Sequence, residues 1–415
     1  MRHINRRLVV MVSAIAVAAI AIGGSLAYRT GPAEAEGNAA PLTGSPTPAP
    51  TPSATPTPAP PAAAPTATPA TVAPRTPSTK PPAKSTKPPE PPTTTSLTGP
   101  THVTLNVSKL PRGRAPQVPY LVDREIRGGS ASAVTVPGTG GVIAIGRLEH
   151  DTLAVVSLNR DVNSGTELLR LQNGTVRRTP GVTSLVTTRD QSAAAYAASR
   201  ISSLGAQTKG GTVYAETYHS VKSLKLPESW NVEVLAFADG KVYFRSAATE
   251  RGQRSLYAWT PGASAAVKVK SVPSPTAVSA NGRYAAAMES LTDAGSCSSV
   301  VEIATGRRLF RTCDNVLTAF NPSGSTVTGG PAYQDGYCDL MNGALDVSGK
   351  LLREWKGCFH QAEFEDDQHV LMVAVAEGGG GDPGTKSAIV RCTITTGECE
   401  LATPISTDKT LRIGT

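Results

Sequence analysis

The stretch from Ala277 to Cys399 contains one short pattern three times: AVSANGRY at 277–284, AFNPSGST at 319–326 and EFEDDQHV at 363–370. Each copy consists of an apolar strand, a tight turn and the beginning of a second strand. Asn, Asp, Ser and Gly fill the turns because they form local hydrogen bonds with the backbone or tolerate positive φ. The pattern therefore predicts β-hairpins that recur along the chain.

A second hairpin follows each copy and carries one cysteine on either arm. The pairs across these turns are Cys297 and Cys313, Cys338 and Cys358, and Cys392 and Cys399. Neighbouring antiparallel strands bring such residues within disulfide distance, so we predict these three bridges among the possible pairings. The alternative, a metal site, lacks the C-x-x-C spacing that is typical of structural zinc. The six cysteines are the only site residues assigned, and no catalytic, cofactor-binding or metal-binding residue is predicted.

Weaker copies of the opening turn precede these three, at 137–141, 188–192 and 236–241. With the glycine or its equivalent as marker, the copies lie at positions 140, 191, 240, 282, 324 and 368, so that neighbours are 42 to 51 residues apart. Four-stranded propeller blades repeat at about 40–50 residues. No long stretch has a sustained helical period, and short strands at regular spacing indicate an all-β fold. We expect a β-propeller.

Two further segments lie outside the six copies, at 119–126 and at 410–413. A ring of sheets is closed most securely when the two ends of the chain share one blade, because this leaves no unpaired edge at the junction. We therefore expect seven four-stranded blades, one of them built from both ends, with six blades as the alternative. The propeller domain is predicted to cover residues 101–415.

The N-terminal part is predicted to anchor the protein in a membrane. Residues 1–7 are short and basic, and an uncharged, mostly apolar run occupies residues 8–28. About 20 apolar residues span a bilayer as a helix, and preceding basic residues keep the N-terminus cytoplasmic. We expect a single-pass anchor with an extracellular C-terminal domain. Ser25-Leu26-Ala27 also fits signal-peptide cleavage, in which case the protein is secreted.

Residues 29–100 are predicted to be a disordered linker. Twenty of the 34 prolines of the chain lie between Pro41 and Pro100, and the late part of the stretch carries Arg75, Lys80, Lys84 and Lys87. Such a composition cannot bury enough apolar surface to offset the entropy of ordering. Proline favours extended polyproline II, which rises about 3.1 Å per residue, so the linker is expected to act as a stalk.

The positive charge of the chain is concentrated outside the predicted propeller. Residues 1–100 carry eight Lys and Arg against three Asp and Glu, which is +5 of the total of +8, and the remainder carries 32 against 29. A protein that binds nucleic acid is expected to concentrate positive charge on its folded domain. We therefore expect no nucleic-acid partner. The propeller is expected to be a monomer.

The turn that begins with Phe320 and ends with Gly324 has an apolar-Phe-x-x-x-Gly pattern that resembles the blade turns of TolB-like and WD-type propellers. The exported region also resembles the membrane-anchored, extracytoplasmic propeller proteins of actinobacteria with proline-rich stalks. The resemblance covers about three quarters of the chain. No Trp-Asp dipeptide ends a blade, which argues against a strict WD assignment, and nothing matches a Pal-docking element, so the resemblance implies the propeller fold and no Tol-system role is carried over from it.

Familiar catalytic motifs are absent: the sequence has no G-x-S-x-G, no H-E-x-x-H and no P-loop. The glycine-rich stretch 378–384 is interpreted as a loop between strands. The densest polar cluster consists of His360, Glu363, Glu365, Asp366, Asp367 and His369. Such side chains can bind a cation or act as acid and base. However, residues 365–367 form the turn of the repeat, where Asp is favoured by local hydrogen bonds, and we expect a solvated turn.

The aromatic residues of the predicted strands are expected to pack between blades. They are Trp230, Trp259, Trp355, Tyr120, Tyr214, Tyr218, Tyr243 and Tyr257. An alternative is that some of them lie at the mouth of the ring and stack on sugars or peptides.

Taken together, the sequence favours a membrane-tethered, extracytoplasmic propeller that acts as a non-catalytic binding or scaffolding module at the cell envelope, without a cofactor. Its ligand, a protein, peptide or glycan, would meet the loops that the blades contribute around the central channel. The alternative is a lactonase-, lyase- or quinone-dehydrogenase-like propeller enzyme, whose channel residues come from several blades and leave no local motif. A third interpretation is an envelope protein with a purely structural role. Fold alone does not decide among these.

Overall fold

The computed structural model describes residues 96–158, 165–201, 207–379 and 382–414. The predicted anchor at 8–28 and most of the predicted linker at 29–100 lie outside these residues. In the described part, the regular elements are β-strands, apart from a short 3-10 turn, η2 (Val107–Lys109). Nothing within those ranges forms a helix that is long and apolar enough to cross a membrane.

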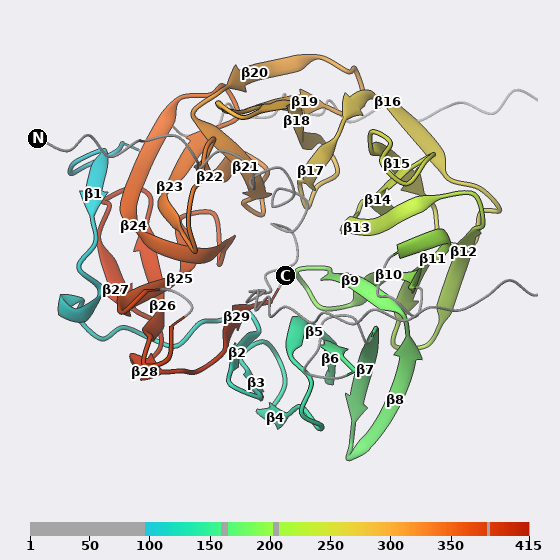
Figure 1. Cartoon of the computed structure of the whole chain (residues 1–415), viewed down its shortest axis with the longest axis horizontal. Helices are drawn as coiled ribbons and strands as arrows, with labels where there is room; N and C mark the ends of the chain where they lie inside the picture. The colour runs from blue at the N-terminus through green and yellow to red at the C-terminus, as the bar shows by residue number, and fades with distance from the viewer. Residues whose placement is uncertain (1–95, 159–164, 202–206, 380–381, 415) are drawn as a thin grey trace, which may run out of the picture. The chain divides into compact units, whose positions relative to one another are not determined.

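Four-stranded antiparallel sheets, here called blades, follow one another along the chain (Figure 1). Blade 1 combines both ends of the described chain: β29 (Leu411–Ile413) is its innermost strand, followed by β2 (Tyr120–Val122), β3 (Glu125–Arg127) and β4 (Val134–Thr135). Blade 2 consists of β5 (Val142–Leu148), β6 (Asp151–Ser157), β7 (Thr166–Gln172) and β8 (Thr175–Pro180). The predicted closure by strands from the two ends is therefore present.

The next three blades each use four consecutive strands. Blade 3 consists of β9 (Val182–Thr187), β10 (Ala193–Ile201), β11 (Gln207–Thr217) and β12 (Val221–Leu226). Blade 4 consists of β13 (Trp230–Ala238), β14 (Lys241–Ala247), β15 (Ser255–Trp259) and β16 (Val267–Pro273). Blade 5 consists of β17 (Pro275–Val278), β18 (Tyr284–Thr292), β19 (Gly295–Glu302) and β20 (Arg308–Thr312).

Blades 6 and 7 share one long strand, β24 (Leu351–Phe364). Up to Phe359 this strand pairs with β23, and from Phe359 onward it pairs with β25, so it is the outer strand of one blade and the inner strand of the next. The other strands of blade 6 are β21 (Asn315–Phe320), β22 (Thr326–Pro331) and β23 (Asp339–Asp346). Those of blade 7 are β25 (His369–Glu377), β26 (Lys386–Thr393) and β27 (Cys399–Leu401), with β28 (Ser406–Thr407) beside β26. β1 (His102–Thr104) adds a parallel strand to the outer edge of β24.

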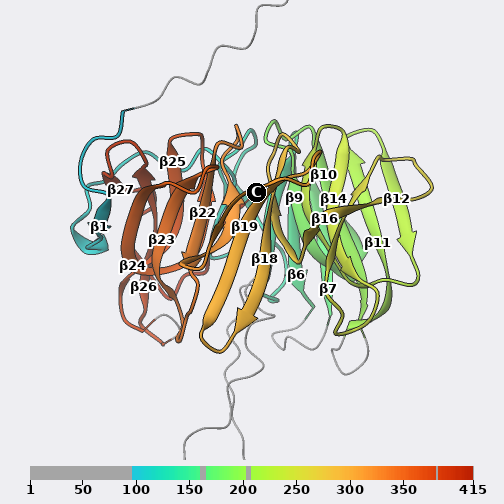
Figure 2. The same ribbon diagram turned by 90° about the horizontal axis from the view of Figure 1, so that it is seen from above.

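The blades succeed one another around a common centre (Figures 1 and 2). Each innermost strand contacts the innermost strand of the next blade, and β29 contacts both β24 and β5, which closes the circle. The apolar core is correspondingly divided. In the described part it consists of seven clusters, and each combines residues of two neighbouring blades, from the cluster of Leu121 and Ile145 to that of Leu371 and Ile413. Burial between blades therefore stabilises the ring.

The ring has two faces, which are distinguished by the connections that they carry (Figure 2). The turn face carries the first turn of each complete blade, including 188–192, 279–283, 321–325 and 365–368. Because successive strands are antiparallel, the connection between the second and third strands lies on the opposite face, here called the loop face. The hairpin ends at 292–295 and 332–338 belong to the loop face.

The repeats predicted at 188–192, 236–241, 277–284, 319–326 and 363–370 fall on first turns of blades. The weak copy at 137–141 was wrong: it connects β4 to β5, and Ser157 donates a backbone hydrogen bond to Gly141 there. The first turn of blade 2 is Glu149-His150 instead. It was missed because it has no glycine, and Glu149 itself adopts the positive φ of 51°.

The three disulfides are Cys297–Cys313, Cys338–Cys358 and Cys392–Cys399, and they leave no cysteine free. These are the predicted pairs. The bridges lie in blades 5, 6 and 7. In each bridge, one cysteine lies in the third strand of the blade or directly before it, and the other lies in the fourth strand or directly after it. Cys392 and Cys399 are direct cross-strand partners. Disulfides persist in oxidising compartments, so the three bridges suggest an extracytoplasmic domain.

Candidate functional site

The polar cluster that the sequence brings together is divided between two places in blade 7. Asp366, Asp367 and His369 lie at the turn between β24 and β25, on the turn face, with Glu365 at its start. His360 lies near the other end of the inner strand, and Glu363 lies between them. The six residues therefore form a turn and a separate strand segment instead of one site.

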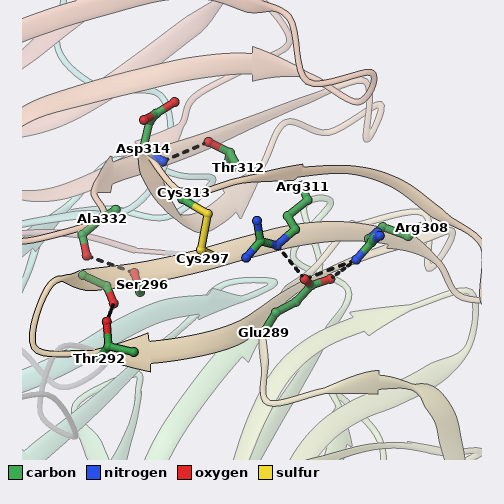
Figure 3. Close-up of a disulfide and its surroundings, with 11 residues drawn as sticks. Glu289, Thr292, Ser296, Cys297, Arg308, Arg311, Thr312, Cys313, Asp314 and Ala332 are labelled. Atoms are coloured by element: carbon green, nitrogen blue, oxygen red, sulfur yellow. Dashed lines mark hydrogen bonds and ion pairs between the residues drawn. A yellow bond between two sulfur atoms is a disulfide. The ribbon is translucent and has the colours of Figure 1, made fainter.

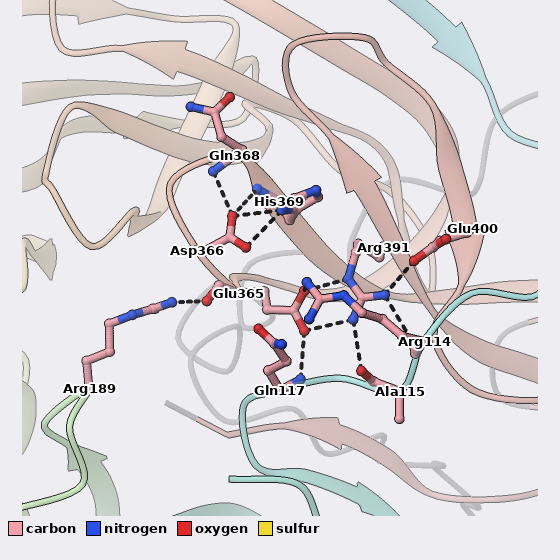
Figure 4. A network of polar contacts seen from close by, with 10 residues as sticks. All are labelled: Arg114, Ala115, Gln117, Arg189, Glu365, Asp366, Gln368, His369, Arg391 and Glu400. Carbon is pink, nitrogen blue, oxygen red and sulfur yellow. Dashed lines mark hydrogen bonds and ion pairs between the residues drawn. The ribbon is translucent and has the colours of Figure 1, made fainter. Parts of the chain in front are cut away.

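Glu365 is the centre of a buried ionic network (Figure 4). Its carboxylate is fully buried and accepts hydrogen bonds from Arg391, at 2.5 Å from Nε and 2.8 Å from Nη2. The backbone N–H of Gln117 donates to it at 2.7 Å, and Arg114 lies 3.3 Å away. The expectation of a solvated turn was wrong for Glu365, because the N-terminal segment 111–119 covers it, a contact that local sequence does not reveal.

The network controls the charge of Glu365. Burial alone would raise the pKa of its carboxyl, but hydrogen bonds from Arg391 and the Gln117 amide, with the charges of Arg391 and Arg114, hold the pKa below its ordinary value. Arg391 is in turn bonded to Glu400 at 2.6 Å and to the carbonyl oxygens of Arg114 and Ala115. Glu365 and Arg391 thus both have hydrogen-bond partners, as expected of a buried ion pair that holds segments of the chain together.

Asp366 forms the local turn that its sequence position predicts. Its carboxylate accepts hydrogen bonds from the backbone N–H groups of Gln368 and His369, each at 2.8 Å, and from Nδ1 of His369. Glu365, Asp366 and His369 place possible metal-ligand atoms within 4.8 Å of one another. The Arg391 guanidinium already neutralises Glu365, so the set lacks the free carboxylate that a cation requires.

First turns of different blades are tied together on the turn face. Asn281 donates to the Ser323 carbonyl at 2.8 Å, and the Ser323 N–H donates to Asp367 at 2.9 Å, so blades 5, 6 and 7 are linked in sequence. Arg189, from blade 3, donates to the backbone carbonyl of Glu365 in blade 7 (Figure 4). Blades 1 and 2 separate these two along the ring. Hydrogen bonds on the turn face thus connect neighbouring blades and also two blades that are not neighbours in the ring.

A second group of titratable residues lies on the inner strands of blades 7 and 1. Burial raises the pKa of Glu363 to about 7, partly opposed by a hydrogen bond from Gln361. Burial and the nearby charge of Arg412 lower the pKa of His360. The side chain of Gln361 joins the two strands through paired hydrogen bonds with the backbone of Ile413. This arrangement favours a neutral carboxyl and a neutral imidazole near neutral pH.

The loop face of blades 5 and 6 exposes large apolar side chains. We call Leu291, Tyr333, Tyr337 and Leu340 the tyrosine platform, and their exposed fractions are 50%, 58%, 72% and 67%. The two hairpin ends touch, because the N–H and hydroxyl of Ser296 both bond to the carbonyl of Ala332 at 3.0 Å. Exposed apolar patches of this kind mark interaction sites.

Two disulfides hold the tyrosine platform. Cys297–Cys313 joins the third and fourth strands of blade 5 beside Ser296 (Figure 3), and Cys338–Cys358 fixes the end of the hairpin that carries Tyr333 and Tyr337. In the same view, Glu289 pairs with Arg308 and Arg311. A surface that is already rigid loses less entropy when it binds a partner.

The platform is surrounded by acidic groups. Asp293, Asp314 and Asp335 are exposed, and Asp339 is half-buried, with a pKa that burial raises to about 6. Neither Tyr284–Gly306 nor Thr312–Gly349 contains a Lys or Arg. This surface was not predicted from the sequence, because its residues are neither periodic nor part of a known motif. The available signal was two tyrosines in a Gly- and Asp-containing loop that ends at a cysteine.

A cavity of about 250 Å³ lies between the outer strands of blades 2 and 3, lined by Arg170, Gln172, Thr175, Arg177 and Tyr218. Buried acidic side chains neutralise the two arginines: Glu216 pairs with both of them, and Asp151 pairs with Arg170 at 2.5 Å. The Arg170 guanidinium also stacks over the Tyr218 ring at 5.7 Å. The cavity therefore offers hydrogen-bond donors without a net positive charge.

The strand aromatics that were expected to pack between blades divide into three groups by their exposure. Trp259 and Trp355 are fully buried, and Tyr120 and Tyr243 nearly so. Trp230, Tyr214 and Tyr257 are half-buried. The expectation was wrong for Tyr218, which is 37% exposed because it lies at the end of β11 beside the cavity. The glycine-rich stretch 378–384 connects β25 to β26, and residues 380–381 lie outside the described ranges.

Solved structures that the chain is similar to are TolB and β-propeller proteins. TolB from Acinetobacter baumannii is 14% identical over 59% of this chain and 67% of that chain, with a TM-score of 0.38. The β-propeller domain of the Trilobed protease from Pyrococcus furiosus is 11% identical over 61% and 94%, with a TM-score of 0.38. Oligogalacturonate lyase in complex with manganese is 12% identical over 68% and 87%, with a TM-score of 0.41. No family model matches the chain, and no curated protein matches it. This level of likeness selects no function.

Proposed function

We propose that the protein is a membrane-tethered, extracytoplasmic, seven-bladed propeller that acts as a non-catalytic binding module at the cell envelope, with its binding surface on the loop face of blades 5 and 6. The observation that carries the proposal is the exposure of Tyr333 and Tyr337, by 58% and 72%, on a hairpin that a disulfide holds. Tyrosines supply large contact area at low entropic cost and are enriched at the centres of interfaces.

The arrangement of charge supports the same surface. On the turn face, the charged groups of the Glu365 network bind one another, whereas Asp293 and Asp335 are exposed beside the tyrosine platform. Exposed charges at the rim of an apolar patch guide partner choice and association rate. The ligand is therefore proposed to be a protein or peptide with positive charge around an apolar centre.

The test compares binding of the full chain to isolated cell-envelope fractions with that of the variant Tyr333→Ser/Tyr337→Ser. We expect at least a tenfold loss of saturable, salt-sensitive binding. Tyr218→Ser, which removes an exposed tyrosine from another part of the ring, is the matched control and should bind normally. Equal binding by the double variant and the wild type would rule out the platform as the binding surface.

A second candidate function is an enzyme of the lactonase, lyase or quinone-dehydrogenase type. The observation in its favour is a pair of groups on the inner strand of blade 7, Glu363 with a pKa that burial raises to about 7 and His360 with a pKa that burial lowers. Groups that titrate near the working pH are suited to acid–base catalysis. Turnover of lactones or uronides that disappears in Glu363→Gln and persists in Tyr333→Ser/Tyr337→Ser would favour this candidate.

A further inference from the structure

The acidic groups around the tyrosine platform have no counter-charges of their own. Residues 284–306 and 312–349 include seven acidic residues and no Lys or Arg. Three of these acids are engaged elsewhere: Glu289 and Glu302 pair with arginines, and Asp346 accepts hydrogen bonds within its own turn. The other four carboxylates have no ion pair and no hydrogen bond among the described residues, and they belong to Asp293, Asp314, Asp335 and Asp339. A surface of this kind is complementary to a cationic partner.

Asp339 differs from the other three acids because it is half-buried. It lies at the base of the hairpin that carries Tyr333 and Tyr337, where β23 begins. Its carboxylate lies against Gly330 on the opposite arm of that hairpin, so closely that a Cβ atom at Gly330 would be 2.8 Å from Oδ2. A carboxylate that is partly withdrawn from water attracts a cation more strongly than an exposed one. The strongest attraction for a cation is therefore expected at this base.

The neighbouring tyrosines narrow the kind of cation. Tyr337 precedes Asp339 by two positions, and the bridge of Cys338 to Cys358 holds the arm between them. An arginine guanidinium is planar, forms paired hydrogen bonds with a carboxylate and stacks on aromatic faces. A lysine ammonium is a strongly hydrated point charge that does neither. A carboxylate beside exposed tyrosine rings thus fits arginine better than lysine.

We infer that the partner of this surface inserts an arginine side chain at the base of the hairpin, where the guanidinium pairs with Asp339 beside the tyrosine platform. The inference rests on the proposed function, because it names the chemical group that the same surface recognises. Asp339 is then the residue that determines specificity for arginine. Asp293, Asp314 and Asp335 are exposed, and their charges increase the rate of association instead.

The test measures binding of the full chain to three fluorescent peptides by anisotropy. They are Leu-Arg-Leu-Arg-Leu and two versions in which lysine or citrulline replaces both arginines. Citrulline keeps the length and planar end of arginine but has no charge. At pH 8, where Asp339 is ionised, we expect the arginine peptide to bind about tenfold more tightly than the citrulline peptide, since hydrogen bonds between charged groups are the stronger ones. The lysine peptide should have an intermediate affinity.

Asp339→Asn removes the charge and keeps the shape of the side chain. It should weaken the arginine peptide about tenfold and leave the citrulline peptide unchanged, which also shows that the platform is folded. Asp335→Asn is the matched control, because it removes the same charge from an exposed position of the same hairpin, and it should cost about threefold or less. Gly330→Ala keeps the charge but displaces the carboxylate, and it should reduce the preference for arginine over citrulline.

Two results would overturn the inference. One is equal binding of the arginine and citrulline peptides by the wild type, or binding of neither. The other is a loss in Asp335→Asn as large as that in Asp339→Asn, which would mean that diffuse negative charge attracts the peptide. Binding of the lysine peptide as tightly as the arginine peptide would refute the choice of arginine.

Envelope fractions separate this inference from the proposed function. If Asp339 anchors the partner, Asp339→Asn should lose envelope binding as Tyr333→Ser/Tyr337→Ser does. Envelope binding that depends on Tyr333 and Tyr337 but is unchanged in Asp339→Asn would preserve the proposed function and refute the arginine anchor. Envelope binding that neither variant changes would refute both.

Discussion

The two faces of the ring use their polar and apolar residues in opposite ways. On the turn face, Glu365 and Arg391 are buried and bind each other, and Arg189 reaches across to the backbone of Glu365. On the loop face of blades 5 and 6, Tyr333 and Tyr337 extend into solvent. The charged groups of the Glu365 network bind one another, while Tyr333 and Tyr337 on the loop face have much of their surface available.

The difference indicates a division of labour within one ring. Buried ion pairs that are fully hydrogen-bonded tie segments together but offer a ligand little, because their charges are already neutralised. Exposed aromatic residues contribute little to folding, since they remain in water, and much to association. If this division is correct, substitutions on the turn face should change stability alone, and substitutions on the loop face should change binding alone.

The largest expected effect is that of Glu365→Gln. The substitution leaves the buried guanidinium of Arg391 without its main counter-charge, and breaking a buried pair in this way costs about 3–5 kcal/mol of unfolding free energy. Urea denaturation followed by tryptophan fluorescence measures the loss. Binding through the tyrosine platform should be unchanged in the folded fraction.

The matched control is Glu400→Gln, because Glu400 contacts the same guanidinium but is 35% exposed. It should cost about 1 kcal/mol or less, as partly exposed pairs do. Equal losses for Glu365→Gln and Glu400→Gln would contradict the central role of Glu365 on the turn face.

The next largest effect is expected from removing a disulfide, and its consequence for binding should depend on which face of the ring the disulfide holds. Cys338→Ser/Cys358→Ser opens a loop of 20 residues and should cost about 3 kcal/mol, and Cys392→Ser/Cys399→Ser opens one of 7 and should cost about 2 kcal/mol in the loop-entropy model. Only the first pair holds the hairpin of Tyr333 and Tyr337. Envelope binding should therefore fall in the first variant and persist in the second, as measured under conditions where both are folded.

Two carboxylates of blade 7, Glu363 on β24 and Glu365 in the turn that follows it, should respond to pH with opposite signs. The pKa of Glu365 is lowered from 4.5, so its contribution to stability is present above that value and is lost as the pH falls through the folded-state pKa. The pKa of Glu363 is raised to about 7, so its contribution is full below 4.5 and is lost as the pH rises through about 7.

Thermal melts between pH 3 and pH 8 measure both effects. Glu363→Gln should reduce the fall in Tm between pH 5 and pH 8 by a few degrees, since about 1 kcal/mol corresponds to roughly 2–4 °C in a domain of this size. Glu365→Gln should flatten the acid limb instead. Glu398→Gln, an exposed substitution, should follow the wild type. A Glu363→Gln profile that parallels the wild type would show that this strand position does not bind a proton on folding.

The smallest expected effect is that of Tyr218→Ala beside the cavity of blades 2 and 3. It removes the ring that lies over Arg170, an interaction worth about 0.5–1 kcal/mol at exposed sites. Chemical denaturation should detect a loss of this size, and envelope binding should not change. A loss of binding here would place a second ligand surface at the cavity and would weaken the assignment to the loop face.

The sequence was sufficient for the fold because the repeat is local. The turns around Gly240, Gly282 and Gly324 carry their own signal, since each of these glycines adopts a positive φ of 65° to 74°. Cysteines on facing strands, such as Cys392 and Cys399, follow from the same hairpins. The turn at Glu149-His150 was not identified because a non-glycine residue takes the left-handed conformation there.

The candidate sites were harder to predict because they depend on contacts between distant segments. Glu365 is buried by Gln117 and Arg114, about 250 positions earlier in the chain, and sequence pattern gives no sign of that contact. The exposure of Tyr333 and Tyr337 depends on how two hairpin ends meet across a blade boundary. In both cases the missing information is the spacing of blades in three dimensions, which a periodic sequence does not encode.

The pairing of β2 with β29 has a consequence for how the protein is made. Val122 pairs with Leu411, so the first blade has no inner strand until the last residues of the domain have been synthesised. At about 5–20 residues per second, the intervening chain takes roughly 15–60 s to emerge. Throughout that interval β2 presents an open edge, and the side chain of Tyr120 is not covered by Leu411 and Ile413 of β29. Nascent chains and truncated products are therefore expected to be the preferred substrates of chaperones and proteases, whereas the finished ring is not.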